Sequence, residues 1–225
     1  STLANNPYVD ALVEIESGKH DAYRTPWQVA KETATSGNHD HIFHTQILPD
    51  NLCRFDGAIR TSIFNNYPHR IRVPVAPLLR LSDSEVARVS EFVARTGIES
   101  FRNRILFECA PGSGQSFLDL PLAIEISMLL TNADRNTCVV ISSPHSLPQA
   151  TNQIIDGSQL TFRENAELAN YCNLLIGCSS GITWLLTSDW CRQIPTVQLL
   201  SRADEAIFAS VVYDLEYFGQ DVSHV

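Results

Sequence analysis

The short run Gly-Cys-Ser-Ser-Gly at residues 177–181 is the part of the sequence whose composition and position best suit chemistry. It follows the apolar residues 174–176, which are typical of a strand, and it precedes apolar residues at helical spacing, at positions 182, 185, 186 and 190. A strand, a tight turn and a helix in this order point backbone N–H groups at the carboxyl edge of a parallel sheet, where anions bind.

Three interpretations of this turn are open. Ser179, Ser180 and Gly181, with Thr183 close behind them, could line a cradle for a phosphate or another anion. The same run fits the G-x-S-x-G pattern of a nucleophile elbow, which would make Ser179 the nucleophile of a hydrolase. In the third interpretation, the small residues only allow the helix to pack closely on the strand.

A second turn rich in glycine and serine follows another apolar strand, residues 104–110, and precedes a helix predicted over residues 120–130. It contains Gly112, Ser113, Gly114, Gln115 and Ser116. It is not a Walker loop, because no Gly-Lys-Ser/Thr follows, and it does not have the G-x-G-x-x-G spacing. If both turns lie at one sheet edge, their N–H groups form a pocket for a diphosphate. The alternative is a plain connecting turn.

The hydrolase interpretation is the less favoured one. After Ser179 it needs an acid and then a histidine, and only His224 follows, close to the end of the sequence. The acid would be one of Asp189, Asp204, Asp214 and Glu216. Only one clear strand follows the turn, whereas an α/β-hydrolase normally carries its acid and histidine on later strand ends.

A histidine cluster near the N-terminus suggests a metal site only at first sight. It consists of His39, Asp40, His41 and His44. On a strand, His39 and His41 share one face while His44 lies on the other, so the three imidazoles do not converge. The sequence therefore predicts no metal site.

Composition limits the class of protein. The 225 residues are 44% hydrophobic and 18% charged, which is typical of a globular protein with a sizeable core. The net charge of −9 argues against non-specific binding to nucleic acid or to an anionic membrane. No apolar run approaches the length of a membrane span, and no signal peptide is evident. Six cysteines without CxxC spacing, of which Cys109, Cys138 and Cys172 flank apolar runs, predict buried thiols in a cytoplasmic protein.

Strands and helices alternate from residue 94 to residue 200, which predicts an α/β fold with a doubly wound, Rossmann-like parallel sheet. The predicted strands cover residues 104–110, 137–142, 160–162, 174–177 and 194–200. The predicted helices cover residues 82–94, 120–130, 164–171, 182–190 and 203–218. We place this C-terminal domain at residues 80–225. Residues 1–79, with a strand at 8–15 and a helix at 26–33, form a partial N-terminal α/β domain.

With both turns identified, the chain resembles the two-Rossmann (GT-B) glycosyltransferases, and in particular the ADP-heptose-type heptosyltransferases of the autotransporter branch. Residues 105–112 resemble the strand and Pro-Gly turn that open the family's second domain. Residues 164–185 resemble the helix, the strand and the D-[ST]-G-x-x-H-L turn of that domain, and residues 194–197 resemble its x-P-T-V strand. Ser179 stands where many members have Asp, and Trp184 where they have His. The family's first βα unit, which usually holds the catalytic carboxylate, has no counterpart, so the chain resembles a transferase truncated at its N-terminus.

The resemblance implies transfer of a sugar from a nucleotide-diphosphate sugar to an acceptor, with the nucleotide-sugar as a substrate and no cofactor or metal. Residues 1–79 would then lie on the acceptor side, and Glu164 would meet the ribose or base. The donor would be bound by Gly112, Ser113, Gly114, Gln115, Ser116, Glu164, Ser179, Ser180, Gly181 and Thr183. No catalytic residue is predicted. The alternative is a non-catalytic module that binds a nucleotide or a sugar.

Overall fold

The structure is a computed structural model that describes residues 3–12, 28, 31–33, 35–37, 76–109, 116–178, 180–201, 211–217 and 219–224. Backbone contacts group residues 1–8 and 73–225 into one compact unit and residues 9–72 into a second. In the second unit, the described positions between 28 and 36 are helical, as the sequence predicts for residues 26–33. The histidines at positions 39, 41 and 44 lie outside the described residues.

The strand predicted over residues 8–15 is wrong at its described positions, 8–12, which lie in no strand. The chain turns just before them. Asn5 has a left-handed φ of 62°, and the Asn6 side chain accepts the Tyr8 N–H at 2.9 Å. Such local side-chain bonds compete with strand pairing.

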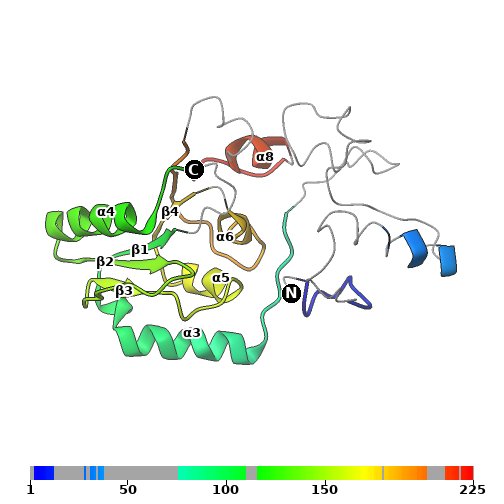
Figure 1. The fold of residues 1–225 in the computed structure, drawn as a ribbon, viewed down its shortest axis with the longest axis horizontal. Coiled ribbons are helices and arrows are strands. Elements are labelled where there is room, and N and C mark those ends of the chain that lie inside the picture. Colours follow the sequence, from blue (N-terminus) through cyan, green and yellow to red (C-terminus); the bar gives the residue numbers. More distant parts are fainter. Residues whose placement is uncertain are drawn as a thin grey trace. The chain divides into compact units, whose positions relative to one another are not determined.

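The first unit contains a five-stranded sheet in the order β3-β2-β1-β4-β5, and every neighbouring pair is parallel (Figure 1). The strands are β1 (Asn103–Glu108), β2 (Thr137–Ser142), β3 (Ile154–Asp156), β4 (Leu174–Gly177) and β5 (Thr196–Gln198). The predicted parallel α/β sheet is thereby confirmed. Leu106, at the centre of β1, lies opposite Val140 of β2 and Leu175 of β4.

The third strand is misplaced in the sequence prediction. It lies at Ile154–Asp156, where two buried β-branched residues pair with β2, and not at residues 160–162. The Leu160 N–H instead donates to the Gly157 carbonyl, and the Thr161 N–H donates to the Glu164 carboxylate. These two bonds close a turn, so the apolar residues around position 160 connect elements and do not form a strand.

Helices cover both faces of the sheet. On one face α4 (Leu120–Ala133) packs over Ile105 and Phe107. On the other, α3 (Asp83–Thr96), α5 (Glu164–Ala169) and α6 (Gly181–Leu185) pack around Leu106. Figure 1 shows α4 and α3 on opposite sides of the strands. Because successive side chains of a strand point to opposite faces, β1 contributes to both cores and all but its first two residues are buried.

The helix ends follow from local chemistry. Ser82 and Glu85 form a capping box at the start of α3, and Gly97 ends this helix with a φ of 68°. A short 3-10 helix, η2 (Ile98–Ser100), follows. The helix predicted over residues 182–190 ends early, at Leu185, where the Thr187 hydroxyl donates to the Trp184 carbonyl. The last described helix is α8 (Val211–Tyr217).

Candidate functional site

The topology singles out the carboxyl ends of β1 and β4 as a ligand edge. The chain leaves β1 through α4 towards β2, and it leaves β4 through α6 towards β5, in the opposite direction along the sheet. Phe107 lies opposite Ile176, so Glu108 and Gly177 end neighbouring strands side by side. Open parallel sheets bind their ligands outside such a topological switch point.

A completely buried carboxylate occupies this edge. The Glu108 side chain has 0% exposure. Its Oε2 accepts the backbone N–H of Cys178 at 2.9 Å and lies 3.1 Å from the Thr183 hydroxyl. The Cys178 thiol lies 2.9 Å from Oε2 and 3.0 Å from Oε1. Glu108 therefore ties the end of β1 to the turn between β4 and α6.

The position of Glu108 follows from the alternation of β1. It shares a face with Leu106, which is the face that α6 covers. Gly177 leaves the necessary room, because a Cβ there would lie 3.1 Å from Thr183 Oγ1 and 3.6 Å from Glu108 Oε2. Of the three interpretations of the 177–181 turn, close packing therefore describes Gly177.

The start of α6 uses part of its hydrogen-bonding capacity internally. Ser180 is the N-cap, and its hydroxyl oxygen accepts the Ile182 N–H at 3.1 Å. The Ser180 N–H donates to the Cys178 carbonyl at 3.0 Å. An anion at this turn therefore meets neither the Cys178 N–H nor the Ser180 N–H unless the turn opens. Gly181 is exposed, whereas Thr183 is buried and directed at Glu108.

Two other predicted donor-binding residues are already engaged. Ser116 is buried, and its hydroxyl oxygen accepts the Leu118 N–H at 3.2 Å. Glu164 is 1% exposed; one carboxylate oxygen accepts the Thr161 N–H at 2.7 Å and the other pairs with Arg88. A ribose or a base could reach this carboxylate only by displacing the Arg88 guanidinium. Gly112, Ser113, Gly114, Gln115 and Ser179 lie outside the described residues, so their roles stay predictions.

An aromatic ring outside the predicted site residues lies at the same edge. Phe162 belongs to the loop between β3 and α5, and it remains 40% exposed. A Cβ on Gly181 would come within 2.6 Å of the Phe162 ring, so the ring lies directly against the first residue of α6. The only signal in the sequence is a phenylalanine beside the polar residues that begin a helix.

The residue after Phe162 anchors this loop. Arg163 is 8% exposed and bonds Glu85 Oε1 through Nε at 2.6 Å, and it also donates to the Arg80 carbonyl. The Arg163 guanidinium, through this hydrogen bond, lowers the pKa of Glu85 to about 2. The β3–α5 loop is thus fixed to the start of α3 by a charged pair.

Burial disfavours the thiolate form of four of the described cysteines. Burial raises the pKa of Cys109, Cys138 and Cys191 to about 11, and that of Cys172 to about 12. Their thiolate fraction at neutral pH is correspondingly small. This confirms that Cys109, Cys138 and Cys172 serve as small buried hydrophobes.

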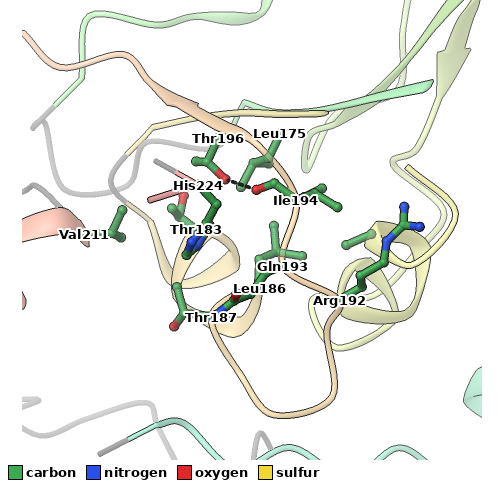
Figure 2. Close-up of a pocket in the computed structure, with 11 residues that line it drawn as sticks. Leu175, Thr183, Leu186, Thr187, Arg192, Gln193, Ile194, Thr196, Val211 and His224 are labelled. Atoms are coloured by element: carbon green, nitrogen blue, oxygen red, sulfur yellow. Dashed lines mark hydrogen bonds between the residues drawn. The ribbon is translucent and has the colours of Figure 1, made fainter. Parts of the chain in front are cut away.

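A small cavity borders α6 and includes the buried Thr183 in its wall. Its volume is about 20 Å³, and Figure 2 shows Thr183, Leu186, Thr187 and His224 among its lining residues. The buried His224 Nδ1 has no hydrogen-bond partner within the described part of the chain. The space is sufficient for about one water molecule. A cleft of about 320 Å³ shares the walls formed by Leu186, Thr187 and His224.

Within the described ranges, no helix is long and apolar enough to cross a membrane. Among the same residues, no three histidine, cysteine or acidic side chains gather as they would around a metal ion.

Comparisons with known proteins assign no family to this chain. No protein-family model, curated protein or solved structure matches it.

Proposed function

We propose that this chain is a nucleotide-sugar-dependent glycosyltransferase, or the donor-binding portion of one, with a GT-B architecture. One observation carries the proposal. The strand order β3-β2-β1-β4-β5 puts the exits of β1 and β4 side by side at a topological switch point. Both turns that the sequence assigns to a diphosphate follow these two strands, and such an edge is where α/β sheets bind nucleotides.

In this proposal some residues of the edge bind the diphosphate and others hold the turn in position. The turn at residues 112–116 binds the diphosphate, together with groups at Ser180 and Gly181. Glu108, through its bonds to the Cys178 N–H and Thr183, keeps the second turn in shape. It is a positioning residue and does not touch the substrate.

The chemistry requires only positioning and charge stabilisation. The bond between the sugar C1 and the diphosphate oxygen breaks, and its electron pair leaves with the nucleoside diphosphate. The oxygen of the acceptor hydroxyl bonds to C1, and its proton passes to water or to the departing diphosphate. Backbone N–H groups aimed at the departing oxygens stabilise that developing charge. Residues 1–79 would contribute to the acceptor side.

Calorimetric titration of the full chain tests the proposal. We expect nucleoside diphosphates and nucleotide-sugars to bind, and a bulky Ser180→Trp substitution to abolish binding. Asn132→Trp is the matched control. Asn132 is an exposed residue near the end of α4, and α4 runs from the ligand edge of the sheet to the opposite edge, so this position is remote from the site. Absence of binding by the wild-type chain, or binding that survives Ser180→Trp, refutes the proposal. Binding without transfer to any acceptor identifies a non-catalytic binding module.

A further inference from the structure

Phe162 is exposed in a loop whose neighbouring residues are fixed. The Thr161 N–H donates to Glu164 at 2.7 Å, and Arg163 is paired with Glu85 at 2.6 Å. Arg163, Glu164 and Asn165 are all buried, whereas Phe162 remains 40% exposed. The backbone thus holds an apolar ring at the surface, although burying it would be favourable.

The ring is also fixed on one side. It lies against Gly181, where even a single Cβ would come within 2.6 Å of Cζ and 2.8 Å of Cε2. The glycine therefore lets the ring lie on the start of α6. A ring held in this way loses little conformational entropy when a second flat group stacks on it.

We propose that Phe162 is the stacking platform for the nucleobase of the bound nucleotide. The inference rests on the proposed function and deepens it by assigning the base to this side of the edge. A phenylalanine ring offers no hydrogen-bonding group, so it suits the face of an aromatic base better than the hydroxyls of the sugar or the charged diphosphate. Aromatic side chains stack on the faces of bases in this manner in many nucleotide-binding sites.

The position fits the remainder of the site. Phe162 follows β3, and the loop that carries it meets the turn after β4, which is assigned to the diphosphate side. A nucleotide whose base rests on Phe162 extends its diphosphate past Ser180 and Gly181 towards the turn after β1. The base and the diphosphate are then recognised by different residues, so their contributions to affinity are separable.

The test compares ligands with and without a base. Calorimetry with ADP, UDP and inorganic pyrophosphate is performed on wild type, Phe162→Ala, Phe162→Trp and Leu129→Ala. Leu129, 65% exposed on α4, is the matched control. We expect Phe162→Ala to weaken ADP or UDP binding roughly 5- to 150-fold and to leave pyrophosphate affinity unchanged. Phe162→Trp retains nucleotide affinity, and Leu129→Ala behaves as wild type.

The contrary outcomes are distinct. Unchanged nucleotide affinity in Phe162→Ala overturns the inference and leaves the proposed function standing. An equal loss of pyrophosphate affinity in Phe162→Ala also overturns the inference and leaves the proposed function standing, because it indicates a structural role for the ring. Far-UV circular dichroism of each variant verifies that it is folded. Failure of the wild-type chain to bind ADP or UDP overturns the proposed function as well.

Discussion

Replacing Glu85 by Gln should remove a pH-dependent part of the stability of this protein. Glu85 bonds Arg163 at 2.6 Å, and its pKa falls from 4.5 to about 2. The Glu85 side chain is only 15% exposed, so solvent screens the pair little. At about 1.4 kcal/mol per pKa unit, this lowering corresponds to about 3 kcal/mol. Glutamine still accepts at the capping box with Ser82, so the substitution removes the charge and retains the cap.

The sign follows from the direction of the pKa change. A carboxylate whose folded pKa lies below its unfolded value stabilises the fold above the unfolded pKa. The contribution is therefore complete above about pH 5, and it is lost as the pH falls from 4.5 through 2. By pH 3, about 2 of the 3 kcal/mol are gone.

Urea unfolding of wild type and Glu85→Gln between pH 7 and pH 3 provides the assay, with circular dichroism and tryptophan fluorescence as probes. We expect the variant to be about 3 kcal/mol less stable at pH 7 and the two curves to converge on acidification. Glu91→Gln, an exposed carboxylate on the same helix, should change stability by less than about 0.5 kcal/mol. Parallel curves, or no destabilisation at pH 7, would refute the reasoning.

Three further predictions concern the ligand edge and the thiols. Glu108→Leu leaves the buried Cys178 N–H and Thr183 hydroxyl without this acceptor, so urea unfolding should show a loss of about 2–5 kcal/mol, whereas Glu108→Gln should lose less. Gly177→Ala should cost about 1–3 kcal/mol in the same assay, because its Cβ lies 3.1 Å from Thr183 Oγ1. Iodoacetamide at pH 7.5 should label the native protein slowly at four cysteines and rapidly in urea, as read by peptide mass spectrometry; rapid native labelling would contradict their raised pKa values. These four are Cys109, Cys138, Cys172 and Cys191.

Local chemistry explains why much of the fold is predictable. The capping box at Ser82 and Glu85 specifies where α3 begins. The β2 prediction matches the observed bounds because the apolar residues 138–141 lie between polar neighbours. The prediction fails where short-range bonds override apolarity. Leu160 and Phe162 read as a strand, but the Thr161–Glu164 capping contact makes them part of a turn.

The candidate site is less predictable because its contacts depend on strand order. Glu108 interacts with residues 70 and 75 positions later, and only the placement of β4 beside β1 brings them together. In the sequence, Glu108 is one polar residue in an apolar run, and Gly177 is the first residue of a turn with three open interpretations. In the structure, Gly177 lies against Thr183 and Glu108 and leaves room for the contact between their side chains.

That contact constrains how a donor is bound. The Glu108 side chain accepts the Cys178 N–H, and the Ser180 N–H donates to the Cys178 carbonyl, so two backbone donors of the β4–α6 turn are already used internally. In the proposed site, the turn after β1 therefore supplies more of the donors to the diphosphate than the β4–α6 turn does. Phe162 lies against Gly181 on the β4–α6 side, where an uncharged base needs no backbone donor.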